Sequence, residues 1–229
     1  MLLPQLARDL LLRGNDKLGA AVWQFNLPAG KTCPGESSLC AGCCYAKRYA
    51  KRFTFVDTTY ADLLALSRRK DFASILSREI IRKDALTVRV HASGDFYSPG
   101  YVRKWIKVAR RCPLTRFYWY TRSWRVPRIF KELQEFARLP NVSGWISVDR
   151  ETGMPADTKG FRVAYMAMDS SDTPPDGVDL VFKVRGRREK TIRMGGVLVC
   201  PVENGAAVVR TITCTQCKLC FRDRSRSRM

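Results

Sequence analysis

The spacing of hydrophobic residues changes several times along the chain, which predicts helices alternating with strands. Between residues 57 and 83, apolar side chains recur at helical intervals. Helical spacing returns after Ser98-Pro99 and after Pro127, where a serine cap or a proline at the first helical position favours a helix start. The residues predicted to face inward on these two helices are Val102, Trp105, Ile106, Ala109, Ile129, Phe130, Leu133 and Phe136.

Strands are predicted where β-branched and aromatic residues form short runs. These runs lie at residues 86–92, 116–120, 142–148, 161–168 and 178–184, and GVLVC at 196–200 closes the series. Strands alternating with helices predict an α/β fold with a parallel sheet. A partial barrel fits this chain better than a complete eightfold barrel, which typically needs about 250 residues. In a buried parallel strand, both faces of the run 116–120 are expected to pack in the core.

Polar or small residues follow the predicted strands at Ser93-Gly94-Asp95, residues 121–124, residues 149–151 and Asp169. In parallel α/β folds the functional site lies beyond the carboxyl ends of the strands. We therefore expect these residues to gather there, although loops are polar in any protein. The neighbouring arginine favours the ionised form of both acids in the run Asp149-Arg150-Glu151, which argues against a glycosidase-type acid–base pair. His91, on a strand, is expected to be a core residue with its hydrogen bonds satisfied.

Charge points to the kind of partner. The chain has 229 residues with 41 Lys and Arg against 21 Asp and Glu, a net charge of +20. Such an excess attracts polyanions, of which nucleic acid is the most common in a cell. The alternative is a protein that is simply basic. The basic tail at 222–229 is a candidate phosphate-binding arm, with the arginines Arg222, Arg224, Arg226 and Arg228.

The N-terminal region contains leucines but is interrupted by Arg8, Asp9 and Arg13. It lacks the ~18 consecutive apolar residues of a membrane helix and the order of a signal peptide. We therefore expect a cytoplasmic protein with no membrane partner. In the reducing cytosol, nine cysteines are expected to be ligands or catalysts rather than disulfides.

Four cysteines lie near the C-terminus, where Cys200-Pro201 precedes Cys214, Cys217 and Cys220 at C-x2-C-x2-C spacing. A close triple of cysteines with a distant Cys-Pro has the composition of a ferredoxin-type iron–sulfur site. Zinc also accepts four thiolates, although structural zinc usually uses two C-x2-4-C pairs. A [4Fe–4S] cluster is the favoured prediction, and zinc or unligated thiols are the alternatives.

A second group of cysteines lies in TCPGESSLCAGCCYAKR, residues 32–48. Cys33, Cys40 and Cys44 are predicted to hold a cluster, with Cys43 as a spare, because adjacent side chains diverge. Three thiolates on a cubane leave one iron open to a ligand, as an incomplete ligand set does at a catalytic zinc site. The alternative is that these cysteines supplement one shared site. Cys112 is expected to be a buried thiol of the core.

These features divide the chain into four predicted parts. They are an N-terminal segment at 1–30, a partial barrel with the cysteine loop at 31–195, a cysteine motif at 196–221 and the basic tail at 222–229.

Several motifs together resemble the phage and plasmid "gene product 88"-like family over roughly residues 20–221. The motifs are TCPGESSLCAGCCYAKR, RVHASGDFYSPGYVRKWI, FYWYTRSWR, ISVDRETGMP, VCPVEN and CTQCKLC. At one remove the layout is similar to radical S-adenosylmethionine (SAM) enzymes, which place a three-cysteine loop after the first strand. The spacing from Cys33 to Cys40 is three residues longer than in that loop.

The more distant resemblance implies roles for individual residues. Ser93, Gly94 and Asp95 stand where such enzymes contact SAM, with Tyr45 beside the cysteines. Asp95, Arg122, Asp149 and Arg150 are the candidate catalytic residues of the pocket. Cys200, Cys214, Cys217 and Cys220 would supply an auxiliary cluster. Candidate nucleic-acid contacts are Arg122, Trp124 and Arg125 together with the arginines of the tail.

Three classes of function are compatible with the sequence. The first is a radical-SAM-like enzyme that acts on nucleic acid or on a target bound to it. The second is a non-catalytic iron–sulfur protein that binds DNA or RNA in a regulatory or replication-associated role, with phosphate contacts from arginines and stacking on aromatic rings. The third is a structural or interaction protein that a bound zinc ion stabilises.

Overall fold

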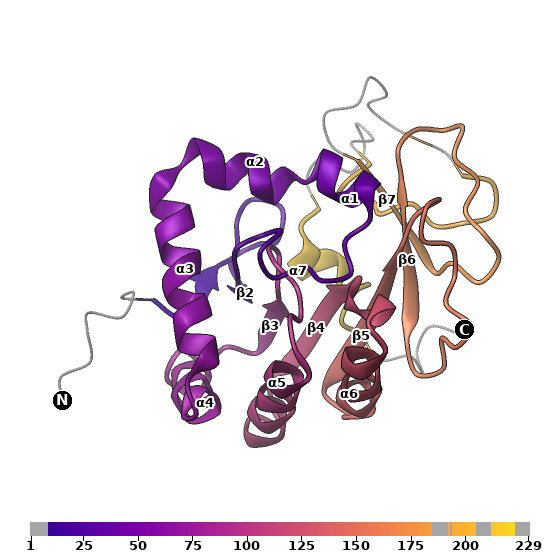
Figure 1. Cartoon of the computed structure of the whole chain (residues 1–229). Helices are drawn as coiled ribbons and strands as arrows, with labels where there is room; N and C mark the ends of the chain where they lie inside the picture. The colour runs from indigo at the N-terminus through magenta and orange to yellow at the C-terminus, as the bar shows by residue number, and fades with distance from the viewer. Residues whose placement is uncertain (1–8, 185–191, 193, 205–211, 223–229) are drawn as a thin grey trace.

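The computed structural model describes residues 9–184, 192, 194–204 and 212–222. Within them, seven strands form one sheet in the order β1-β2-β3-β4-β5-β6-β7, in which β2 to β7 are parallel and β1 is an antiparallel edge (Figure 1). The prediction of a mostly parallel α/β fold is confirmed. The strands are β1 (Leu12–Arg13), β2 (Val22–Phe25), β3 (Thr87–Val90), β4 (Arg116–Thr121), β5 (Val142–Val148), β6 (Arg162–Ala167) and β7 (Leu180–Lys183).

A turn connects β1 to β2, helices connect the strands from β2 to β5, and loops connect the later strands. The helices are α1 (Ser38–Cys43), α2 (Tyr45–Arg52), α3 (Thr54–Arg68), α4 (Phe72–Arg82), α5 (Pro99–Arg111), α6 (Pro127–Ala137) and α7 (Cys214–Cys217), with a 3-10 turn η1 at Ser123–Arg125. Sequential parallel strands joined by right-handed crossovers place their helices on one face of the sheet. Figure 1 shows α4, α5 and α6 aligned along that face.

Several element boundaries differ from the sequence prediction. The helical pattern at 57–83 belongs to two helices, because the chain is extended at Arg69, which pairs with Asp71 (2.7 Å). The segment GVLVC contributes one bridge, from Val199 to Val181, rather than a regular strand. The strand β2 and the helices α1 and α2 were not predicted. The predicted cap is present, since Ser98 Oγ accepts a hydrogen bond from the Tyr101 backbone N–H (3.2 Å).

Aromatic side chains fill the main core between the sheet and the helices. Trp119 on β4 stacks on Phe136 of α6, with 5.8 Å between ring centroids, and Phe117 meets Trp105 of α5 at 6.3 Å. On the opposite face of β4, Tyr118 is also buried. The expectation that both faces of this strand are buried is therefore confirmed.

The C-terminal residues 212–222 cover the second face of the sheet. Phe221 packs on Tyr118 with 5.1 Å between ring centroids, and the Trp145 indole N–H donates to the Cys220 carbonyl (2.9 Å). Arg162 on β6 donates to the carbonyls of Leu219 (2.9 Å) and Arg222 (2.8 Å). The C-terminal cysteine motif is therefore part of the sheet packing.

Among the described residues, no helix is long and apolar enough to cross a membrane.

Candidate functional site

A cavity of about 270 Å³ opens at the carboxyl ends of the parallel strands. Its lining brings together residues from the cysteine loop, from the segment after β3 and from the end of β4. Residues singled out from the sequence that line it are Cys33, Cys40, Cys43, Cys44, Tyr45, His91, Ser93, Gly94, Asp95 and Arg122. The expectation that the strand ends meet the cysteine loop is confirmed for these residues.

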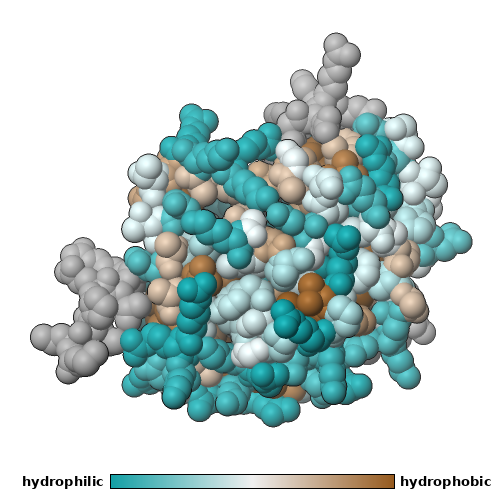
Figure 2. Space-filling view, viewed as in Figure 1, coloured by the Kyte–Doolittle hydropathy of each residue, from teal (hydrophilic) through white to brown (hydrophobic). Residues whose placement is uncertain are grey.

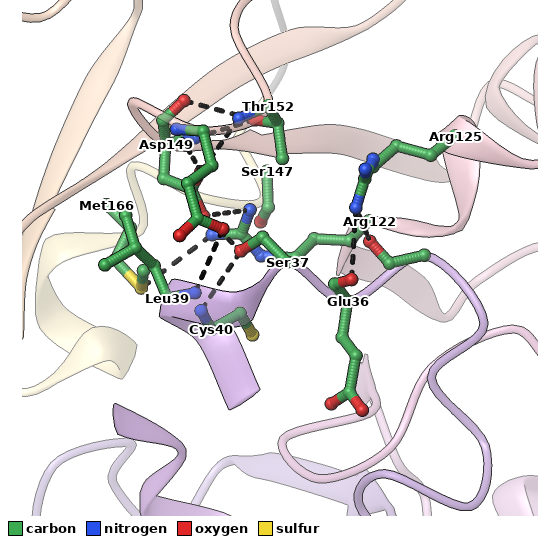
Figure 3. A network of polar contacts seen from close by, with 12 residues as sticks. Glu36, Ser37, Leu39, Cys40, Arg122, Arg125, Ser147, Asp149, Thr152 and Met166 are labelled. Carbon is green, nitrogen blue, oxygen red and sulfur yellow. Dashed lines mark hydrogen bonds and ion pairs between the residues drawn. The ribbon is translucent and has the colours of Figure 1, made fainter. Parts of the chain in front are cut away.

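A buried ion pair joins the ends of β4 and β5, and its carboxylate also holds the cysteine loop through Ser37 (Figure 3). Arg122 Nη1 lies 2.7 Å from Asp149 Oδ2, and both side chains are almost fully buried. The Ser37 hydroxyl donates to the same oxygen (2.6 Å) and also caps α1 by accepting from the Cys40 N–H (3.0 Å). Burial acts to raise the pKa of Asp149, but the Ser37 hydrogen bond, the Arg122 charge and backbone N–H donors outweigh it, so this pKa is lowered. Asp149 is thus an ionised anchor of the loop.

A second contact brings the loop against β4. Arg125 Nη1 donates to the carbonyls of Gly35 (3.1 Å) and Glu36 (3.0 Å). A Cβ added to Gly35 would lie 1.9 Å from the Arg122 carbonyl oxygen, so only glycine allows this close approach.

Asp95 forms the rim of the cavity after β3. Its carboxylate accepts from the Thr121 hydroxyl (2.5 Å) and from the N–H groups of Phe96 (2.7 Å), Arg122 (2.8 Å) and Ser123 (3.2 Å). Burial nonetheless dominates and raises the pKa of Asp95. With four protein donors on its carboxylate, Asp95 ties the end of β3 to the end of β4.

Gly94 lets the segment after β3 pack closely on the cysteine loop. Its φ is +80°, and an added Cβ would lie 2.6 Å from Thr32 Oγ1 and 2.7 Å from Leu27 Cβ. Ser93 Oγ donates to the Leu27 carbonyl (2.8 Å), and Tyr45 Oη donates to the Ala92 carbonyl. The residues proposed for SAM contact therefore form a rigid wall of the cavity.

The four thiols of the loop line this cavity without forming a closed site. Among the residues that the structure describes, no group of three or more Cys, His, Asp or Glu is arranged to hold a metal ion. Burial raises the pKa of Cys33 to about 12 and that of Cys40 to about 11. These thiols are therefore protonated at neutral pH unless a cation displaces the protons. The donor set fits an iron–sulfur cluster chemically.

The C-terminal thiols lie against the other face of the sheet. Cys200, Cys214, Cys217 and Cys220 line one small cavity of about 10 Å³. The Cys214 N–H donates to the Lys17 carbonyl (2.9 Å), which fixes the start of α7. Burial raises the pKa of Cys200 to about 11 and that of Cys220 to about 12. The four residues that the sequence groups together therefore lie around one cavity, and their role as metal ligands stays a prediction.

Other predicted site residues have different surroundings. Arg150 is exposed and pairs with Asp172 (3.4 Å). Neither Arg150 nor the buried Asp149 lines the cavity, which corrects the assignment of both residues to the pocket. Trp124 donates its indole N–H to the Ser147 carbonyl (2.9 Å). Because Arg122 is buried in the ion pair with Asp149, it is not a surface contact for phosphate.

The basic tail is only partly described. Arg222 is exposed, whereas Arg224, Arg226 and Arg228 lie outside the described residues. Arg125 is exposed, but its guanidinium already donates to the loop carbonyls. The predicted nucleic-acid contacts therefore do not form one surface among the described residues.

Two further expectations concern the core. His91 is buried, and its Nε2 lies 2.9 Å from Tyr101 Oη. Cys112 is buried on the helix side of the sheet. Both residues belong to the core as predicted. The hydrogen bonds of His91 are satisfied only in part, because its buried Nδ1 has no partner among the described residues.

The sequence interpretation missed Arg89 and Met166. Arg89 projects from β3 into the cavity, and Met166 Sδ lies 3.7 Å from Arg122 Nη2 and 3.8 Å from Cys43 Sγ. A charged residue inside the apolar strand run LTVRVHA was the available signal for Arg89. Met166 carried no comparable signal.

Comparisons with known proteins agree with the motif resemblance. Residues 9–223 match the family model described as "Gene product 88". The gene 88 protein of Mycobacterium phage L5 is 28% identical over 230 residues, covering 92% of this chain and 87% of the phage protein. The gene 88 protein of Mycobacterium phage D29 is 29% identical over 169 residues, covering 67% and 68% respectively. No solved structure matches the chain. Because the family model matches nearly all of its length, the chain belongs to the gene product 88 family.

Proposed function

We propose that the chain is an iron–sulfur protein with a radical-SAM-like core that acts on nucleic acid or on a target bound to it. Cys33, Cys40 and Cys44 would hold a [4Fe–4S] cluster with one open iron. The observation that carries the proposal is that these three cysteines share one cavity of about 270 Å³ with Ser93, Gly94 and other strand-end residues. A cavity of this size leaves room for a small ligand beside the cysteines.

The fold supports the proposal in a second way. Six sequential parallel strands with their helices on one face are what a partial barrel requires. The cysteine loop follows β2, the first strand of the parallel series. This is the order that the resemblance to radical SAM enzymes implies.

When bound, the cluster would supply an electron that cleaves SAM and starts radical chemistry. The chain's own residues would shape and enclose the site. Asp149, paired with Arg122, holds the cysteine loop through Ser37. Asp95 joins the ends of β3 and β4, and Gly94 brings the wall close to the loop. Tyr45 closes the side of the cavity next to α2.

The C-terminal cysteines support a different occupant. Their cavity of about 10 Å³ holds roughly one water-sized particle. This size suits a single zinc ion better than a cubane, although the thiols as they lie are not arranged to hold either. A zinc ion here would pin residues 212–222 to the sheet, whereas a cluster would require the four thiols to move apart.

Metal counts on matched variants test the proposal. The chain is purified anaerobically, and iron, sulfide and zinc are measured in the wild type and in a triple Cys33→Ala, Cys40→Ala, Cys44→Ala variant. About four irons and four sulfides lost only in this variant would support the cluster. Cys112→Ala is the control, because this thiol lies on the helix side of the sheet. No iron at the loop in the wild type would contradict the proposal.

A non-catalytic iron–sulfur protein that binds nucleic acid is the alternative. The net charge of +20 favours nucleic-acid binding equally in both cases. The two are distinguished by SAM consumption, measured as the appearance of cleavage products with the reduced protein. Retained cluster and nucleic-acid binding without SAM cleavage would favour the alternative.

A further inference from the structure

A second and larger cavity adjoins the cysteine site. It has a volume of about 380 Å³ and lies between β1 to β3 and the helices α2 and α3. Tyr45, Arg89 and Ser93 line both cavities, so the two are adjacent. Near β2 and β3, the sheet face is polar, with Gln24 directly opposite Arg89 in the strand register.

Arg89 adds a positive charge to this cavity, where the acidic lining residue Glu203 is already paired with Lys17. It stands on the sheet face opposite the helices, with its guanidinium 5.7 Å from the Tyr120 ring centroid. Its Nε atom is buried and has no hydrogen-bond partner in the described part of the chain. The ion pairs found among the described residues do not include Arg89. A buried guanidinium nitrogen without an acceptor is costly, and an anionic ligand at Arg89 would remove that cost.

Aromatic rings stand at the mouth of the same cavity. Tyr45 is 51% exposed, Tyr49 50% and Phe55 65%, and all three line the cavity. Tyr45 and Tyr49 lie one helical turn apart on α2. Exposed apolar side chains are common singly, but a group of them at one cavity marks a ligand site, and aromatic rings suit planar bases.

Basic side chains of α2 surround these rings. The helix sequence YAKRYAKR contains four basic residues and no acidic residue. Lys47 pairs with Glu36 (2.9 Å), whereas Arg48, Lys51 and Arg52 are exposed and have no carboxylate partner among the described residues. Figure 2 shows hydrophilic side chains over the part of the surface that α2 occupies.

We infer that α2 and the start of α3 bind single-stranded nucleic acid and direct one nucleotide into the cavity at Arg89. Bases stack on Tyr45, Tyr49 and Phe55, and the backbone phosphates contact Arg48, Lys51 and Arg52. The nucleotide inside the cavity presents its phosphate to Arg89, next to the cysteine site. This inference rests on the proposed function for its biological meaning, and it names the strand form and the surface of the nucleic-acid partner.

A duplex fits this site less well. Stacking on aromatic rings requires bases that are free of their partners, and the cavity accommodates a single small group. An acidic membrane surface is the other polyanion that a basic helix attracts. It does not account for a guanidinium below the surface beside a closed cavity.

Fluorescence anisotropy of the full chain with labelled 20-nucleotide single strands tests the inference. DNA and RNA strands, the matching DNA duplex and phosphatidylserine vesicles form the separate arms. The triple variant Arg48→Ala, Lys51→Ala, Arg52→Ala is expected to weaken single-strand binding at least tenfold. The slope of log affinity against log salt should become shallower by about 2, since each phosphate contact contributes about 0.7 for single strands.

Variants of the aromatic residues and of Arg89 test the two other parts of the inference, which are base stacking and phosphate binding in the cavity. Tyr49→Ala and Phe55→Ala should each weaken binding roughly 5- to 150-fold, the range for one stacked base. Arg89→Gln should weaken binding while the metal content stays unchanged. Loss of metal without loss of binding would show that Arg89 serves the cysteine site, and would overturn this part of the inference.

Matched controls remove the same charge and the same exposed apolar area elsewhere. The triple variant Lys107→Ala, Arg110→Ala, Lys131→Ala changes exposed residues of α5 and α6, and Ile81→Ala removes a side chain that is 65% exposed, like Phe55. Both controls should bind as the wild type does.

The remaining outcomes separate this inference from the proposed function. The inference would be overturned if the control and α2 triple variants lost the same amount of affinity for single strands. Tighter binding of the duplex than of single strands, or binding of vesicles alone, would also overturn it. Single-strand binding through α2 by a chain that takes up no iron would contradict the proposed function and leave the inference intact. Iron uptake without single-strand binding would contradict the inference and leave the iron–sulfur part of the proposed function intact.

Discussion

The ion pair between Arg122 and Asp149 should join the ends of β4 and β5 and hold the carboxylate that anchors the cysteine loop through Ser37. In Asp149→Ala, the Arg122 guanidinium remains buried without its counter-charge, and the Ser37 hydroxyl and the N–H groups of Glu151 (2.9 Å) and Thr152 (3.0 Å) lose their acceptor. Removing one partner of a buried pair costs about 3–5 kcal/mol. We expect the free energy of unfolding to fall by about that amount, a large part of the ~5–15 kcal/mol typical of a domain.

Urea unfolding followed by tryptophan fluorescence measures this change, because Trp105, Trp119 and Trp145 are buried. Glu135→Ala is the control, since its pair with Arg138 is exposed and should contribute nothing measurable. In the double variant with Arg122→Met, the loss should be smaller than the sum of the two single losses, because no unpaired charge remains. A loss below about 1 kcal/mol in Asp149→Ala, or simple additivity, would refute the proposed role of this pair.

Three further predictions concern His91 in the core, Gly94 in the wall of the cavity and Arg162, which binds the C-terminal residues 212–222. Burial lowers the pKa of His91 to about 3, so below pH ~6.5 the unfolded chain binds a proton that the folded chain does not. Stability should then fall by up to about 1.4 kcal/mol per pH unit as the pH drops, and His91→Asn, measured between pH 6.5 and 5, should remove this slope; an unchanged slope would contradict the assignment. Gly94→Ala should destabilise the fold more than Gly153→Ala, because both glycines have positive φ but only the Cβ at Gly94 meets other atoms; equal losses in urea unfolding would show that the close packing is unimportant. Arg162→Ala should speed alkylation of the C-terminal cysteines, because two carbonyls of that segment lose their hydrogen-bond donor. The control variant Arg138→Ala should leave the alkylation rate unchanged. Equal rates in the two variants would contradict the role of Arg162 in holding this segment on the sheet.

The sequence predicted those parts of the fold that local chemistry determines. Ser98 and Pro127 mark helix starts through their own backbone preferences, and the run 116–120 is apolar on both faces because both faces are covered. The short strand β2 was missed, because VWQF has only four residues and includes a polar side chain that faces the cavity. No local pattern distinguishes such a strand from a loop.

The surroundings of individual site residues could not be predicted from the sequence, because they depend on contacts between segments that are distant along the chain. The sequence placed Arg122 and Arg125 among the nucleic-acid contacts, because an arginine in a loop is usually exposed. Their actual partners, Asp149 and the carbonyls of Gly35 and Glu36, lie about 25 to 90 positions away and become neighbours only after the sheet forms. The cysteines were grouped correctly because their spacing along the chain carries the signal.

The basic helix α2 shows the opposite case. Its pattern YAKRYAKR was visible in the sequence, with two tyrosines and two Lys-Arg pairs at a spacing of four. The cysteines immediately before it drew the interpretation toward metal binding. The ring exposure and the neighbouring cavity became apparent only in the structure.

Electron paramagnetic resonance of the anaerobically reduced protein, with and without SAM, tests the central claim most directly. An open iron at the Cys33, Cys40 and Cys44 site predicts the spectrum of a reduced [4Fe–4S] cluster that changes when SAM is added and disappears in the triple cysteine variant. A cluster spectrum that SAM leaves unchanged would contradict an open, SAM-binding iron. A protein that contains zinc and gives no iron–sulfur signal would contradict the cluster itself.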